Sequence, residues 1–185
     1  MKIIGIATSP RKGGNSQKLV ESVLAGAKDA GAETELICLT DQNIHPCIGC
    51  GDCKSGHDTC AQKDDMSMLY EKIAAADGII FGAPIYFGRL NAQAYMVIDR
   101  MWALLNPDFS LRIPAGKKFA VALTCGPGDA KTIQPMEQYF QNTVCGIFGF
   151  TYAGTVWQNQ LMSPADLEKF PEKITEANEL GKRLV

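Results

Sequence analysis

Four cysteines fall within one short run of the chain, and their spacing is typical of a metal-binding loop. The run reads C-I-G-C-G-D-C-K-S-G-H-D-T-C, a C-x2-C-x2-C-x6-C pattern that contains Cys47, Cys50, Cys53 and Cys60. A [4Fe–4S] cluster is held by four thiolates that converge from a tight loop. Glycines inside the run allow such wrapping, because glycine adopts positive φ without a Cβ clash. If the loop holds a cluster, the protein moves electrons.

Three interpretations of this run stay open on the residues alone. The number, compact spacing and sulfur-only character of the ligands favour a [4Fe–4S] cluster. Zinc is the least favoured, since zinc sites more often pair two separated C-x-x-C units. The third is a loop of reduced thiols, or a labile disulfide, without metal. His45 and His57 lie beside and inside the run, and we expect them to be solvated.

Composition narrows the class of protein. The chain has 185 residues, 46% of them hydrophobic. Its net charge of −2 argues against nucleic acid or a membrane surface as a partner. We expect one domain over 1–185 with a cysteine-rich loop at 40–65. No signal-peptide pattern and no long apolar span is seen, so a cytoplasmic location is expected. Seven cysteines in that compartment indicate metal-binding or redox groups.

The elements that must position these groups alternate between strands and helices. Apolar runs predict strands at Lys2–Thr8, Glu33–Leu39, Gly78–Ala83, Lys118–Thr124 and Ile147–Val156. Stripes of helical period lie between them, at 19–27, 66–73, 95–105 and 136–144. After Ser163-Pro164, a last helix is either kinked at Pro171 or begins there after a short turn. The prediction is an α/β fold, a flavodoxin-like doubly wound three-layer sandwich with a five-stranded parallel sheet in the order 2-1-3-4-5.

The loop after the first strand carries chemistry for a phosphate. It reads Ser9-Pro10-Arg11-Lys12-Gly13-Gly14-Asn15-Ser16 and opens the first helix. Glycines at a helix N-terminus present free N–H groups and the positive end of the helix dipole. Arg11 offers a fork that matches phosphate oxygens, while Asn15 and Ser16 suit the helix cap. Neither a Walker A motif nor G-x-G-x-x-G occurs, which disfavours an NTP or Rossmann-type dinucleotide site.

This loop resembles the phosphate loop of the NADPH-dependent FMN reductase family, a flavodoxin-fold group. A second run, Pro84-Ile85-Tyr86-Phe87-Gly88, resembles that family's isoalloxazine-binding loop, and Asp99-Arg100 resembles its pattern in the next helix. The cysteine run with Lys63-Asp64-Asp65-Met66 resembles the branch called iron–sulfur flavoproteins, whose cysteines ligate a [4Fe–4S] cluster. The resemblance covers roughly residues 1–130.

The resemblance implies a set of cofactor-binding residues. The FMN phosphate would be held by Ser9, Arg11, Gly14, Asn15 and Ser16, and the ring by Pro84, Ile85, Tyr86, Phe87 and Gly88. A third loop follows the fourth strand, where we expect contacts from Thr124 and Gly126 and a helix N-cap at Asp129. Cys38, Cys125 and Cys145 are expected to pack. The run after Gly88, Arg89-Leu90-Asn91-Ala92-Gln93, departs from the family and leaves the electron donor open.

By resemblance, the protein is an FMN-dependent oxidoreductase that passes electrons between a reduced donor (NAD(P)H or ferredoxin), FMN and a [4Fe–4S] cluster. One alternative is an NAD(P)H-dependent FMN or quinone reductase without a cluster. Another is a non-enzymatic phosphate- or metal-binding regulator. A small molecule or a protein would be the electron partner, and a homodimer or homotetramer is implied. No catalytic side chain is required, because the cofactor carries the chemistry.

Overall fold

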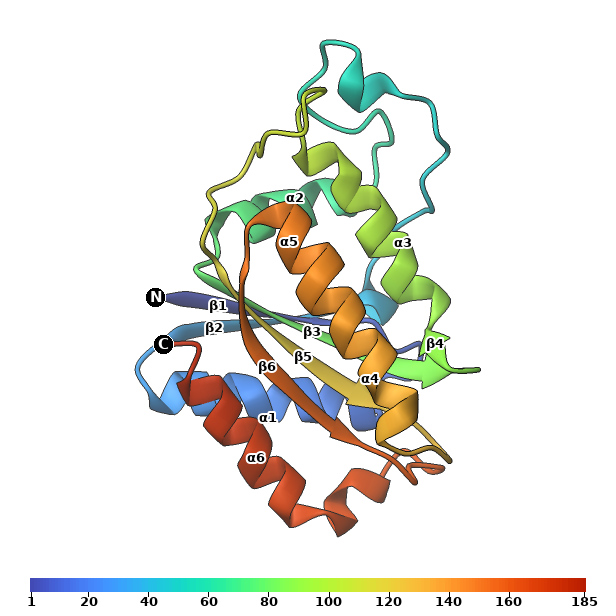
Figure 1. The fold of residues 1–185 in the computed structure, drawn as a ribbon, viewed down its shortest axis with the longest axis vertical. Helices are drawn as coiled ribbons and strands as arrows, with labels where there is room; N and C mark the ends of the chain where they lie inside the picture. The colour runs from blue at the N-terminus through green and yellow to red at the C-terminus, as the bar shows by residue number, and fades with distance from the viewer.

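A parallel β-sheet forms the centre of the computed structural model, which describes residues 1–185 (Figure 1). Its order is β2-β1-β3-β5-β6, with bounds β1 (Lys2–Ala7), β2 (Glu33–Cys38), β3 (Gly78–Tyr86), β5 (Lys118–Thr124) and β6 (Thr151–Gln158). These five strands pair in parallel. A short β4 (Arg89–Leu90) pairs antiparallel with the end of β3. The predicted flavodoxin-like sheet is confirmed, with β4 as an addition.

Helices cover both faces of the sheet and complete three layers. On one face lie α1 (Asn15–Asp29) and α6 (Pro171–Lys182) (Figure 1). On the other lie α2 (Met66–Ala75), α3 (Ala92–Arg100), α4 (Ala130–Gln138) and α5 (Cys145–Phe148). Two clusters of buried apolar side chains fill the spaces between the layers. The central strands β3 and β5 are buried almost throughout, which explains their continuous apolar sequences.

Two glycines let α1 and α6 pack backbone against backbone. A Cβ placed on Gly26 would lie 1.9 Å from the carbonyl oxygen of Asn178, and one on Gly181 would lie 1.9 Å from that of Val23. No side chain fits at these distances, so each helix requires glycine where the other crosses it. This contact holds α6 against α1, and it places the segment between β6 and α6 near the loop that precedes α1.

Two predicted strand boundaries are wrong. The strand expected to end at Ala83 continues to Tyr86, so Pro84, Ile85 and Tyr86 belong to β3 and not to a loop after it. The strand expected from Ile147 begins at Thr151, because residues before it belong to a long helical segment. That segment runs from α4 through a π-helical turn (Tyr139–Val144) into α5, and ends where Gly149 takes φ +60°. The apolar Ile147 and Phe148 fit a helix face as well as a strand, so periodicity alone misplaced the boundary. The last helix begins at Pro171 after a 3₁₀ turn, one of the two predicted options. No helix is long and apolar enough to span a membrane.

Candidate functional site

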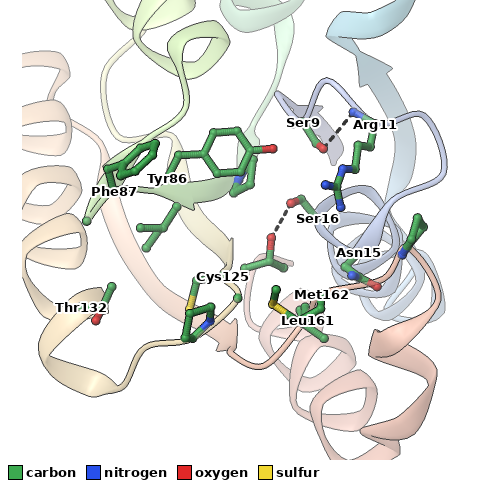
Figure 2. A pocket seen from close by; sticks show the side chains of 17 residues that line it. Ser9, Arg11, Asn15, Ser16, Tyr86, Phe87, Cys125, Thr132, Leu161 and Met162 are labelled. Atoms are coloured by element: carbon green, nitrogen blue, oxygen red, sulfur yellow. Dashed lines mark hydrogen bonds between the residues drawn. The ribbon is translucent and has the colours of Figure 1, made fainter.

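A cavity of about 590 Å³ opens at the carboxyl ends of β1, β3 and β5 (Figure 2). Parallel α/β sheets bind ligands at this edge, because the loops that follow neighbouring strands meet there. The cavity is lined by Ser9, Arg11, Asn15, Ser16, Pro84, Ile85, Tyr86, Phe87, Gly88, Thr124, Cys125, Gly126, Pro127, Thr132, Leu161, Met162 and Pro164. All predicted cofactor-binding residues except Gly14 are among them. The structure thus brings three separate sequence motifs to one place.

One end of the cavity brings together a cationic side chain, hydroxyl groups and the N-terminus of α1. The Arg11 N–H donates to Ser9 Oγ at 3.2 Å, which shapes the turn, and the buried Ser16 hydroxyl is 2.5 Å from that of Thr124. Gly14 is the N-cap of α1, so Asn15 and Ser16 stand inside the helix and their predicted capping role is wrong. The Arg11 side chain is exposed and forms no ion pair within the chain. Its charge, the hydroxyls and the N-terminus of α1 therefore face one region (Figure 2).

Asn15 has a different role from the one its position suggested. Its Nδ2 donates to the carbonyl oxygen of Ser163 at 2.7 Å, and its Oδ1 accepts from the N–H of Leu167 at 3.0 Å. The amide therefore joins the loop after β1 to the segment after β6. Both ends of the side chain are engaged within the protein.

The opposite wall of the cavity is a β-hairpin. Tyr86 pairs with Arg89, so Phe87 and Gly88 form a two-residue turn, with φ values of +51° and +74°. Positive φ at both turn residues is the type I′ geometry, which suits glycine but strains phenylalanine. The Phe87 side chain is fully exposed. A strained aromatic residue at the mouth of a cavity points to a functional use of that side chain.

A buried asparagine fixes this hairpin to the sheet. Asn91 Nδ2 donates to the carbonyl oxygen of Thr8 at 2.7 Å, and the Thr8 hydroxyl lies 3.0 Å from Asn91 Oδ1. The Asn91 N–H also donates to the carbonyl oxygen of Pro84. The end of β1 and the hairpin after β3 therefore hold one position relative to each other.

The floor of the cavity comes from a segment that sequence reasoning missed. Leu161, Met162 and Pro164 follow β6, the last strand, and so reach the same sheet edge. A Cβ on Gly126 would lie 2.9 Å from Met162 Sδ, so the glycine gives the methionine its space. Burial raises the pKa of the nearby Cys125 thiol, which keeps it neutral and favours the predicted packing role. The sequence could have indicated this segment, because the loop after each parallel strand lies at the carboxyl edge of the sheet.

The cysteine loop lies apart from the cavity and is irregular except for a 3₁₀ turn at Asp52–Lys54. All four of its cysteines are free thiols; Cys47 and Cys50 are exposed, and Cys53 and Cys60 are half-buried. The glycines between them, Gly49, Gly51 and Gly56, have positive φ as predicted. No three His, Cys, Asp or Glu side chains are gathered so that they could hold a metal ion. The donor set suits a cluster chemically, but its thiols are not assembled around one point.

Fold and site together define a flavodoxin-like protein with a cavity at the carboxyl edge of its sheet. The chain belongs to the NADPH-dependent FMN reductase family, whose family model matches residues 1–166. The protein is therefore a flavin-dependent oxidoreductase, as predicted, and the alternative of a non-enzymatic regulator is wrong.

Sequence relatives point to one branch of this family. The chain is 40% identical to an iron–sulfur flavoprotein of Methanosarcina thermophila over 139 residues, which cover 75% of this chain and 72% of the relative. It is 35% identical to one of Methanocaldococcus jannaschii over 193 residues, which cover 100% of this chain and 95% of that protein. The predicted resemblance to iron–sulfur flavoproteins is confirmed.

Solved structures agree on the fold. An NAD(P)H:quinone oxidoreductase from Methanothermobacter marburgensis superposes with a TM-score of 0.76, at 17% identity, over 100% of this chain and 99% of the other. An FMN-dependent NADH-azoreductase from Bacillus anthracis, solved with FMN, gives a TM-score of 0.73 at 15% identity, over 100% and 99%. At this identity the likeness supports the fold alone.

Proposed function

We propose that this protein is an electron-transfer flavoprotein that passes electrons between a reduced donor, FMN and a [4Fe–4S] cluster. The observation that carries the proposal is the loop of four free thiols, Cys47, Cys50, Cys53 and Cys60, on a chain of an FMN reductase family. A relative that matches along the whole chain is named an iron–sulfur flavoprotein, which supports it.

The cavity residues fit FMN. We assign the phosphate to Ser9, Arg11 and Ser16 at the N-terminus of α1, where a cation, hydroxyls and N–H groups suit an anion. We assign the ring to Pro84–Gly88 on one side and to Thr124 and Gly126 on the other, with the exposed Met162 at the edge of the cavity. Tyr86 and Phe87 supply apolar faces at the cavity mouth, where a nicotinamide from NAD(P)H can stack directly on the ring. When bound, FMN accepts a hydride or single electrons, and a cluster exchanges single electrons.

The cysteine residues fit a cluster by their chemistry. Soft thiolates are the ligands that iron–sulfur clusters take, and none of these four is used in a disulfide. The glycines with positive φ give the loop the backbone freedom to bring the exposed Cys47 and Cys50 toward the half-buried Cys53 and Cys60. The protein's part is to hold these thiols.

The test is the cofactor content of protein purified without oxygen. We expect one FMN per chain together with about four irons and four sulfides. Cys50→Ser should lose most of the iron and keep FMN, whereas Cys38→Ser, outside the loop, should keep both. Wild-type protein with FMN but without iron or sulfide after anaerobic reconstitution would contradict the cluster.

A second candidate is an NAD(P)H-dependent FMN or quinone reductase without a cluster. The four thiols are not gathered around one point, which favours this second candidate. It predicts that Cys50→Ser leaves NAD(P)H oxidation with a quinone acceptor unchanged and that no iron is bound at any stage.

We also propose a homodimer or homotetramer. Large apolar side chains are exposed at the cavity mouth, at Phe87, and near the cysteine loop, at Ile48 and Phe109, where another copy could cover them. Analytical ultracentrifugation tests it: a monomer at micromolar concentration would contradict the proposal, and Phe87→Asp should weaken the assembly.

A further inference from the structure

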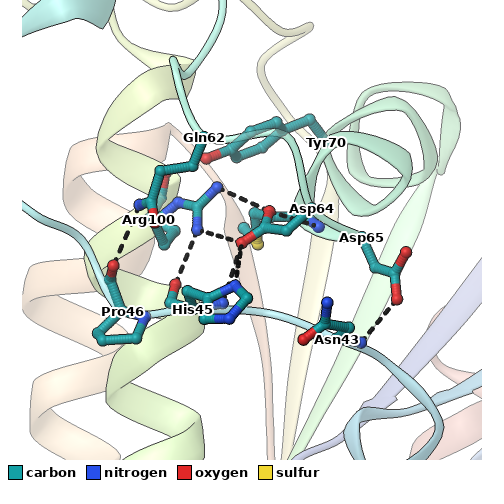
Figure 3. A network of polar contacts seen from close by, with 9 residues as sticks. Asn43, His45, Pro46, Gln62, Asp64, Asp65, Tyr70 and Arg100 are labelled. Carbon is teal, nitrogen blue, oxygen red and sulfur yellow. Dashed lines mark hydrogen bonds and ion pairs between the residues drawn. The ribbon is translucent and has the colours of Figure 1, made fainter.

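A buried ion pair lies at the foot of the cysteine loop. Arg100, the last residue of α3, donates from Nη1 to Asp64 Oδ2 at 2.8 Å and from Nη2 to Asp64 Oδ1 at 2.9 Å (Figure 3). The two side chains are 1% and 3% exposed. A two-pronged contact of this kind fixes both position and orientation.

The same pair joins the segment that enters the cysteine loop to the segment that leaves it. Arg100 Nη1 also donates to the carbonyl oxygen of His45 at 2.7 Å, and the His45 N–H donates to Asp64 Oδ2 at 2.9 Å. Just outside, the Asn43 N–H donates to Asp65 Oδ2 at 2.6 Å and the Asp65 N–H to the Asn43 carbonyl oxygen at 3.1 Å. The loop is therefore closed at its base, and the four cysteines stand beyond that closure.

Two further hydrogen bonds hold the backbone around this pair and within the loop. The Tyr70 hydroxyl donates to the Arg100 carbonyl oxygen at 2.8 Å. At the far end of the loop, Arg112 Nη2 donates to the Cys53 carbonyl oxygen at 3.0 Å. Only Cys47 and Cys50 remain exposed.

The network is not explained by stability alone. A buried ion pair gains little over apolar residues of equal volume, because both charges lose their hydration. Arg100 Nε is in addition the one buried side-chain polar atom without a partner in the whole chain. Such an orphan donor calls for a specific explanation.

We propose that Arg100 and Asp64 are positioning residues for the cluster, which hold the ends of the cysteine loop together before iron and sulfide arrive. With the base closed, the thiols have only a short loop left to order, which lowers the entropic cost of assembling the site. This inference rests on the proposed function. It assigns to the pair a role in taking up and keeping the cluster, and none in binding FMN.

The test compares variants in anaerobic reconstitution with ferrous iron and sulfide. Arg100→Lys keeps the charge but loses the fork; Arg100→Met combined with Asp64→Asn removes both charges, so no unpaired one stays buried. Lys117→Met is the matched control, since Lys117 is a buried cation that donates to the Ala74 and Ala76 carbonyl oxygens, away from the loop. FMN affinity reports whether each variant is folded.

We expect both Arg100 variants to lose iron to a chelator roughly tenfold faster than wild type, as when groups that support metal ligands are removed. Their cluster-free forms should exchange the amide hydrogens of 47–60 faster, while FMN affinity stays within twofold and Lys117→Met matches wild type. Unchanged iron loss in Arg100→Lys and in the double variant would overturn the inference and leave the cluster standing. Wild-type protein that takes up no iron or sulfide would instead overturn the proposed function, and this inference with it.

Discussion

Asn15 Oδ1 accepts a hydrogen bond from the N–H of Leu167 at 3.0 Å, across 152 positions of the sequence. The Asn15 amide also donates to the Ser163 carbonyl oxygen. One side chain thus holds the C-terminal segment that carries Met162 against the loop that carries Arg11. The cavity is complete only because the start and the end of the chain meet there.

Asn15→Ala should therefore loosen the cavity floor. The change leaves two backbone groups unpaired, which should cost about 1–3 kcal/mol of the free energy of unfolding and weaken FMN binding severalfold. Urea denaturation and a fluorescence titration with FMN measure the two effects. Asn178→Ala on α6, which removes a hydrogen bond to the Ile174 carbonyl oxygen away from the cavity, serves as the control. Equal FMN affinity in the two variants would contradict this role of Asn15.

Arg11→Ala should weaken FMN binding roughly tenfold to a hundredfold, since a hydrogen bond to a charged group contributes about 1.5–3 kcal/mol. Riboflavin lacks the phosphate, so its affinity should not change. Lys12→Ala is the control, because Lys12 pairs with Asp41 at 2.7 Å on the surface. A loss of riboflavin affinity equal to that of FMN would place Arg11 at the ring instead of the phosphate.

Phe87→Asn should separate stability from activity. Asparagine tolerates the positive φ of this turn and should add about 0.5–1 kcal/mol to the free energy of unfolding of the FMN-free protein. Loss of the exposed ring should at the same time lower the rate of NAD(P)H oxidation. Thermal unfolding and steady-state kinetics test the two parts, and a less stable variant would show that the turn is not strained.

Low pH should weaken the Arg100–Asp64 contact that closes the cysteine loop. Burial raises the pKa of the Asp64 carboxyl, but hydrogen bonds from Arg100 and from the His45 N–H outweigh burial and lower the pKa from 3.8 to about 2. A lowered folded-state pKa adds stability above the unfolded value, here about 2 kcal/mol, that disappears as pH falls from about 4 to 2. Asp64→Asn should be less stable at pH 7 and should show a flatter loss of stability across that range in urea titrations.

Gly181→Ala should break the contact between α1 and α6. The added Cβ would meet the Val23 carbonyl oxygen at 1.9 Å, so we expect a loss of about 1–3 kcal/mol or more in the free energy of unfolding. Gly146→Ala is a sharp control, because its Cβ has no neighbour within 4 Å and alanine favours the helix by about 1 kcal/mol. The two changes should therefore have opposite signs in chemical denaturation.

Much of the fold was predictable because its signals are local. Continuous apolar runs identified β1, β3 and β5, and turn residues at their ends identified the loops that line the cavity. The error at Ile147 came from apolar residues that suit both a helix and a strand. The short β4 was missed since its two residues carry no period at all.

The sequence by itself determined the class of fold, the family and the three loops that meet at the sheet edge, because the loops that follow neighbouring parallel strands lie at the same edge of the sheet. Only the tertiary structure decided that Asn15 binds the C-terminal segment, that Met162 lines the cavity and that Arg100 and Asp64 close the cysteine loop. Each of these contacts joins residues far apart along the chain. Such pairings leave no periodic pattern in the sequence, since they depend on how whole elements pack.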